Sequence, residues 1–206
     1  MKTISQWTIR NSFIVIVLCS MIPAFGVILT YGFLDYRRSA CQVWDQAASL
    51  AKSLTAQQEQ LTGNTKLLLK TISRFDAVKN YDIPKTENLF KQLQAENPIY
   101  ANFLLIDLNG LQVASSVPPP GQVILSDRKY FKESVQNQRF SAGEWVMGRT
   151  LMTPAIHFAA PVFDEANSLI GVLATAVPLD KYDSLLSQVS LPSGSRVITI
   201  DHQGKR

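Results

Sequence analysis

The segment PAIHFAAPVFDEANSLIGVLATAVPLD, residues 154–180, decides the fold of this chain. Two runs rich in apolar and β-branched residues stand on either side of a short polar loop over residues 164–168, a pattern typical of two strands and a turn. A connection this short joins antiparallel neighbours. The segment therefore predicts a β-hairpin, and GEWVMGRT, residues 143–150, adds a third strand before it.

Two further strands are predicted in NFLLIDLNGLQVASS, residues 102–116, where Asn109 and Gly110 supply the positive φ of a tight turn. A short amphipathic helix over residues 82–96 precedes them. A second helix over 126–138 starts with Ser126 or Asp127 as a plausible N-cap, and a third follows over 179–189. This order predicts an α+β fold with an antiparallel five-stranded sheet and flanking helices.

The N-terminal part of the chain is strongly apolar. Residues 11–34, NSFIVIVLCSMIPAFGVILTYGFL, contain no charged residue and are long enough to cross a bilayer. We expect a cytoplasmic segment over 1–11 and a transmembrane helix over 12–34. A cleaved signal peptide is the alternative, but its apolar core is shorter and ends at a small-x-small site. Basic residues flank both ends, so the positive-inside count is a tie.

Residues 35–78 are predicted to form one long stalk helix, because no proline occurs between residue 35 and Pro84. Apolar residues recur in alternating steps of three and four, at Val43, Ala47, Leu50, Leu54, Leu61, Leu68, Ile72 and Phe75. This seam fits a helix packed on its own domain, and it also fits a stalk that pairs with a second subunit. Both remain open, and a homodimer through the stalk is expected.

A strand-turn pattern occurs twice. FLLIDLNGLQ, residues 103–112, and VITIDHQGKR, residues 197–206, each place an apolar run before Ile-Asp, two residues and Gly. The repeat predicts one module over 79–190 and the start of a second over 191–206.

The anchor, the long helix, LLIDLNG, SDRKYF, PAIHFAAPVFD, LIGVLATAVPLD and ITIDHQG together resemble the double Cache sensors, which are tandem PAS-like modules. Such modules occur on bacterial chemoreceptors, sensor histidine kinases and cyclic-dinucleotide enzymes. The resemblance implies a bacterial inner-membrane protein, single-pass within this chain, whose membrane-distal sensor faces the periplasm. It also implies a second transmembrane helix and an output domain that this chain lacks.

Catalytic signatures are absent from the sequence: it has no GxSxG, HExxH, GxxxxGK[ST] or GxGxxG. Two cysteines and two distant histidines give no zinc pattern, so no metal or cofactor is expected. The 20 basic residues are scattered among 16 acidic ones, which argues against nucleic-acid binding. No enzyme is predicted in this chain, although the full-length protein is compatible with a histidine kinase or a diguanylate cyclase.

A ligand pocket is predicted near two segments. SDRKYF offers Arg128, whose planar guanidinium can donate two hydrogen bonds to a carboxylate, and Tyr130, with Ser126 nearby. The next strand and its loop add Trp145, Arg149 and Thr150. The resemblance implies that ligand lies between the sheet and the loops around these segments. His157 is predicted to be a half-buried structural residue.

The resemblance also narrows the ligand class. Family members that bind amino acids share an Arg-x-Trp-Tyr cluster, an upstream Tyr and acidic residues that hold the ammonium group. Here Arg128 and Tyr130 keep part of that cluster, but Val123 or Ile124 stands upstream and Arg149 lies where an acid is expected. Like charge disfavours an ammonium group there. A small organic acid is therefore predicted. The alternative function is a membrane-anchored adhesive or structural protein with a coiled stalk and a β-rich head.

Overall fold

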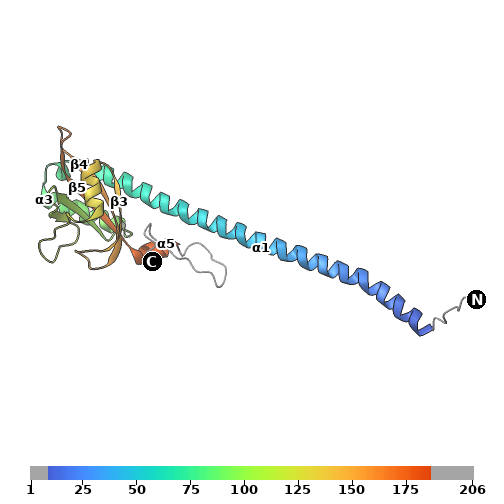
Figure 1. The fold of residues 1–206 in the computed structure, drawn as a ribbon. Coiled ribbons are helices and arrows are strands. Elements are labelled where there is room, and N and C mark those ends of the chain that lie inside the picture. The colour runs from blue at the N-terminus through green and yellow to red at the C-terminus, as the bar shows by residue number, and fades with distance from the viewer. Residues whose placement is uncertain (1–8, 187–206) are drawn as a thin grey trace, which may run out of the picture. The chain divides into compact units, whose positions relative to one another are not determined.

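The computed structural model describes residues 9–186, and Figure 1 draws the remaining residues as a grey trace. The chain divides into two compact units, Met1–Lys52 and Ser53–Arg206. The predicted start of a second module over 191–206 lies outside the described residues.

Within the first unit, the described residues belong to helix α1 (Ile9–Ile72), which contains Pro23. Its apolar side chains Ile16, Phe25 and Leu29 are more than half exposed. Over residues 9–186, no helix combines the length and apolar character needed to cross a bilayer, so the transmembrane helix predicted over 12–34 is not confirmed.

The second unit is built on one antiparallel sheet of five strands, which confirms the predicted sheet. The strand order is β2-β1-β5-β4-β3, with the three labelled strands visible in Figure 1. The strands are β1 (Asn102–Asp107), β2 (Gln112–Ser115), β3 (Ser141–Met147), β4 (Pro154–Phe163) and β5 (Leu169–Pro178). The 154–180 segment forms the hairpin β4–β5, and β5 lies at the centre because it also pairs with β1.

The turn between β1 and β2 is closed by Asp107, whose carboxylate accepts hydrogen bonds from the backbone N–H of Asn109 and Leu111 at 2.9 and 2.8 Å. Gly110 has φ +85°, and a Cβ there would lie 2.5 Å from the Cβ of Ser126. Both the positive φ and the close approach of Ser126 require glycine at this position. The glycine lets the loop before α4 pack directly on the turn.

One face of the sheet is covered by the last turns of α1 with α2 (Asp76–Lys79), α3 (Ile83–Glu96) and α5 (Leu179–Leu186). Leu61, Leu68 and Ile72 of the predicted heptad seam pack into this core. This part of the seam therefore serves the chain's own domain. Helix α1 ends at Ile72, whereas the sequence predicted a helix through residue 78.

The opposite face carries α4 (Lys129–Asn137), yellow in Figure 1, which packs on β3, β4 and β5. Tyr130 and Phe131 bury against Leu104 and Ala174 in a second, smaller core. The predicted N-cap is wrong. Arg128 occupies the N-cap position without a side-chain capping bond, because the Asp127 carboxylate is engaged by Arg149 instead.

Candidate ligand-binding cavity

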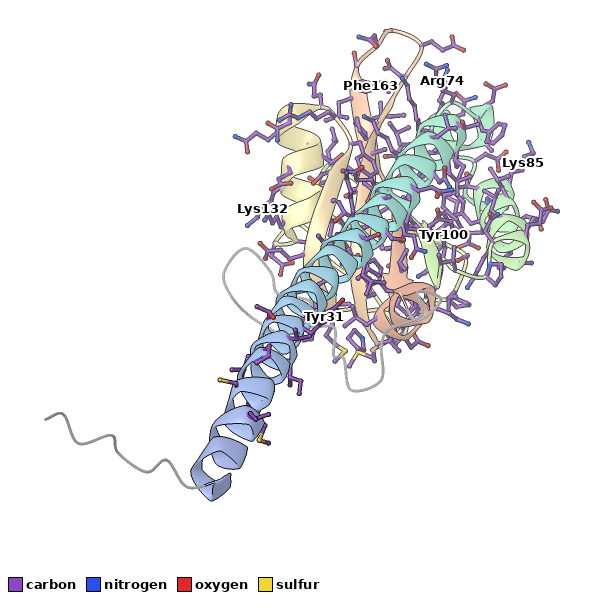
Figure 2. The ribbon with its side chains drawn as sticks, turned by 90° about the vertical axis from the view of Figure 1, so that its right-hand side faces the viewer. Tyr31, Arg74, Lys85, Tyr100, Lys132 and Phe163 are labelled. Atoms are coloured by element: carbon purple, nitrogen blue, oxygen red, sulfur yellow. The ribbon has the colours of Figure 1, made fainter. Side chains whose placement is uncertain are left out.

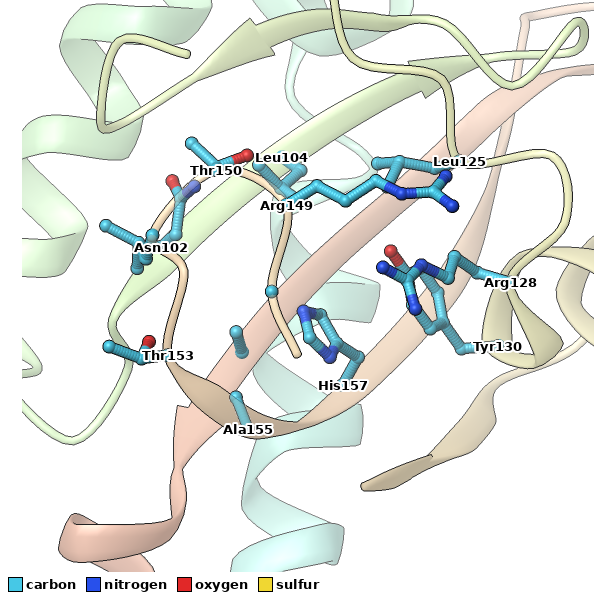
Figure 3. A pocket seen from close by; sticks show the side chains of 13 residues that line it. Asn102, Leu104, Leu125, Arg128, Tyr130, Arg149, Thr150, Thr153, Ala155 and His157 are labelled. Atoms are coloured by element: carbon cyan, nitrogen blue, oxygen red, sulfur yellow. The ribbon is translucent and has the colours of Figure 1, made fainter. Parts of the chain in front are cut away.

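A small cavity lies on the α4 face of the sheet. Its floor is a row across three strands, in which His157 of β4 faces Ala176 of β5, and Ala176 faces Asn102 of β1. Its walls come from the start of α4 and from the loop between β3 and β4 (Figure 3). The lining residues are Asn102, Leu104, Leu125, Arg128, Tyr130, Gly148, Arg149, Thr150, Leu151, Thr153, Ala155, His157 and Ala176.

Two guanidinium groups line the cavity, and no carboxylate does. Arg128 donates one hydrogen bond to the Met147 carbonyl at 3.0 Å, which holds its side chain across the cavity edge. Arg149 forms a bidentate ion pair with Asp127, with N–O distances of 2.7 and 2.8 Å, and also donates to the Ile124 carbonyl. The hydrogen bond from the Arg149 side chain holds the pKa of the Asp127 carboxyl below its usual range.

A buried aromatic pair stands beside these cations. The rings of Tyr130 and His157 are stacked, with centroids 5.0 Å apart and planes 8° from parallel. Burial raises the pKa of the Tyr130 hydroxyl. Burial, together with the Arg128 charge, lowers the pKa of His157 to about 4, so this imidazole is neutral at neutral pH.

The His157 ring has an unused hydrogen-bonding atom. His157 is 6 % exposed, and its Nδ1 has no partner among the described residues. Unpaired buried polar atoms are rare in folded proteins. Figure 3 shows the ring turned into the cavity between the two arginines and Ala155. The free Nδ1 is therefore positioned to meet a polar group of a bound molecule.

Two polar side chains at the opposite side of the cavity are used by the fold. The Thr150 hydroxyl donates to the Gln112 amide oxygen at 2.9 Å, which ties the β3–β4 loop to β2. The Asn102 amide oxygen accepts hydrogen bonds from the hydroxyls of Ser115 and Ser116 at 2.9 and 2.7 Å. These contacts set the position of the loop and of the first hairpin. Within the described ranges, no group of three or more metal-ligating side chains gathers.

The solved structures that are similar to this chain include ligand-binding and sensor domains. No family model and no curated protein sequence matches the chain. Among solved structures, it is similar to the ligand-binding domain of the Campylobacter jejuni chemoreceptor Tlp3 in complex with 4-methylisoleucine, with 12 % identity and a TM-score of 0.55 over 66 % of this chain and 59 % of that one. The sensor domain of the Vibrio cholerae histidine kinase DctB gives 19 % identity and a TM-score of 0.59, over 71 % and 60 %.

A third similar structure is the ligand-binding domain of the Pseudomonas aeruginosa amino-acid chemoreceptor PctC in complex with GABA, at 17 % identity and a TM-score of 0.54, over 68 % of this chain and 64 % of that one. The chain has the fold of a Cache sensor domain. It spans about three fifths of the length of these structures.

Four of the six predicted site residues line the cavity of this Cache fold, namely Arg128, Tyr130, Arg149 and Thr150. Ser126 is exposed and packs on the β1–β2 turn, so it lies outside the lining. Trp145 is 54 % exposed and also lies outside it.

The position of Trp145 follows from the strand register. An irregularity between Ala142 and Trp145 pairs Trp145 with Ile156. Ile156 packs on the α1 side of the sheet, whereas its neighbours Ala155 and His157 line the cavity. Paired residues share a face, so the tryptophan lies on the face opposite the cavity.

The cavity has a volume of about 20 Å³, which is room for a single water molecule. The β3–β4 loop is held in place by the contacts of Arg149 with Asp127 and with the Ile124 carbonyl, and by the hydrogen bond from Thr150 to Gln112. A ligand larger than water therefore requires this loop to move.

Proposed function

We propose that this chain is the sensory part of a membrane-anchored receptor and that its cavity binds a small organic acid. The observation that carries the proposal is the lining itself: two arginines, a neutral histidine with a free nitrogen, and no carboxylate. A carboxylate accepts paired hydrogen bonds from a guanidinium, and such charge-assisted bonds are about twice as strong as neutral ones.

The same lining argues against a ligand that carries an ammonium group. Asp127 is the acidic residue that contacts the lining residue Arg149. Its carboxylate is bound by both terminal nitrogens of Arg149, and Asp127 does not itself line the cavity. A buried ammonium without an acidic partner carries a large desolvation cost. The Tlp3 and PctC domains are seen with 4-methylisoleucine and GABA, which are properties of those proteins. For this chain we propose only that the cavity binds the carboxylate group of its ligand.

Binding is proposed to act by selecting an open form of the cavity. A ligand that contacts Arg128 and Arg149 favours the form in which the Arg149–Asp127 pair is broken and the loop has moved. That difference in affinity shifts the population of the two forms.

The membrane anchor and the stalk belong to the same proposal. The uncharged run over residues 11–34 supports an inner-membrane anchor, with the sensor on the periplasmic side. The seam at residues 43–50, before the part that packs on the sheet, supports pairing with a second copy. Cysteines placed singly over 43–50 should cross-link in membranes, and the pattern should change on ligand addition. An identical pattern with and without ligand contradicts transmission through this helix.

Isothermal titration of the full chain in nonionic detergent tests the ligand class. Acetate, propionate and succinate should include a binder, whereas alanine and GABA should not bind. Replacing Arg128 with Ala should weaken binding by about 2–5 kcal/mol, because it removes the partner of a desolvated carboxylate. The matched control is Lys132→Ala, which removes an exposed cation of the same helix outside the cavity. Binding of amino acids alone, or no binding and no rise in melting temperature with any acid, contradicts the proposal and favours the structural alternative.

A further inference from the structure

A second and larger hollow lies on the other side of the domain from the candidate cavity. It is formed by the end of α1, by α2, by the segment between α4 and β3, and by the end of β4, and its volume is about 480 Å³. This lies within the usual range for small-molecule sites. Figure 2 shows Arg74 and Phe163, two of its lining residues, at the same end of the domain.

The lining of this groove is strongly cationic. Lys66, Lys70, Arg74, Lys79 and Arg139 line it, together with a single carboxylate. Within the described residues, none of these five cations forms an ion pair. The carboxylate, that of Asp164, accepts a hydrogen bond from the Ser168 backbone at 2.7 Å inside its own turn. The groove therefore carries five positive charges and one negative charge.

Helix stability accounts for only part of this charge. Lys66 and Lys70 are four residues apart in α1, and like charges at this spacing destabilise a helix by a few tenths of a kcal/mol. Lys70 and Lys79 lie in the last turns of α1 and α2, where cations interact favourably with the helix dipole, but Lys66, Arg74 and Arg139 do not. The five converge because three separate segments meet here.

The floor of the groove is apolar. Phe140 and Phe163 are half-buried and line it together with Pro161 and Ala160. Phe140 is held by stacking on Phe158, with ring centroids 6.0 Å apart. The groove thus combines aromatic and other apolar lining residues with cations. That combination suits a molecule with several anionic groups on a flat apolar body.

We propose that this groove is a second ligand site, which binds a compact polyanion with two or more carboxylate or phosphate groups and a flat apolar part. The site is independent of the proposed sensing cavity. It lies against the α1 side of the sheet, whereas the cavity lies on the α4 side.

Isothermal titration of the full chain in nonionic detergent, at low and at physiological salt, tests the proposal with trimesate, inorganic pyrophosphate and benzoate as probes. Trimesate should bind in a saturable way and more tightly than benzoate, which carries one charge. A comparison of trimesate with pyrophosphate separates the carboxylate from the phosphate source. Replacing both Lys70 and Arg139 with Gln should weaken trimesate binding about tenfold, since each exposed ion pair is worth up to about fivefold.

Two control variants make the result specific. Lys91→Gln with Lys132→Gln removes the same charge from exposed positions outside the groove, and it should change trimesate affinity less than about twofold. Arg128→Ala should leave trimesate binding intact, because it acts only on the cavity. Equal weakening by both double variants, loss of binding in Arg128→Ala, or absence of saturable binding overturns the proposal. Binding of anionic vesicles without binding of any small probe overturns it as well.

Discussion

His157 should make the stability of the domain depend on pH in a defined window. The ring is 6 % exposed and stacked on Tyr130, and the Arg128 charge lies close enough to disfavour its protonation. Lowering the pH is therefore the perturbation. At low pH, His157 is protonated in the unfolded chain but stays neutral in the folded chain, so protonation favours the unfolded state.

The magnitude follows from the two pKa values. Burial, and then the Arg128 charge, lower the pKa of His157 from 6.5 to about 4 in the folded state. Because the unfolded state binds the proton more readily, the free energy of unfolding falls as the pH drops from about 6.5 to about 4, and this contribution is constant outside that window. A shift of this size corresponds to about 3 kcal/mol. The lowered pKa of Asp127 acts at more acidic pH, since its stabilisation is lost only as the pH falls below the usual carboxyl range.

Urea unfolding of the full chain, followed by circular dichroism at a series of pH values from about 4 to 7, measures this effect. His157→Gln should remove most of the pH dependence in the window. Arg128→Gln should reduce it, because the pKa of His157 then rises toward its usual value. Two results refute the reasoning: a loss below about 1 kcal/mol in the unsubstituted chain, or the same loss in His157→Gln.

The other predictions concern the cavity mouth and the sheet. Asp127→Asn should tighten carboxylate binding about two- to fivefold in isothermal titration, because Arg149 is then free to bind the ligand. Asp82→Asn, which breaks a similar exposed ion pair elsewhere, should leave the affinity unchanged. Weaker binding in Asp127→Asn contradicts this role of the ion pair. Gly171→Ala should cost about 1–3 kcal/mol in urea unfolding, because its Cβ would lie 2.3 Å from the Tyr81 hydroxyl, whereas Gly121→Ala, with open space around it, should be near neutral; equal costs would argue against the clash.

The fold was predictable because its elements have strong local signals. The alternating residues of 154–180 and the turn at Asn109–Gly110 specify hairpins by short-range chemistry. The α1 seam was predictable for the same reason, but periodicity does not say what covers an apolar face. Leu61, Leu68 and Ile72 meet the chain's own sheet, and only the packed structure distinguishes that from a partner helix.

The site was less predictable because side-chain direction depends on register. Arg128 and Arg149 were predicted from their chemistry and line the cavity, whereas Trp145 lies on the other face because of a strand irregularity that nothing local marks. His157 was assigned a structural role. Its place in an alternating strand next to Ala155 could have shown its face, but its free Nδ1 depends on neighbours distant in sequence. The cationic groove was also missed, because Arg139 joins the α1 lysines only in the folded domain.

The exposure of the Arg149–Asp127 pair limits how strongly the cavity resists opening. The two side chains are 41 % and 55 % exposed, and ion pairs of this kind contribute at most about 1 kcal/mol. The pair alone therefore favours the closed form of the proposed scheme by about fivefold at most. The hydrogen bond between Thr150 and Gln112 and the contact of Arg149 with the Ile124 carbonyl add to this preference. The apparent affinity is reduced by the fraction of molecules in the open form, so each of these contacts weakens ligand binding and increases the change in population that a saturating ligand produces.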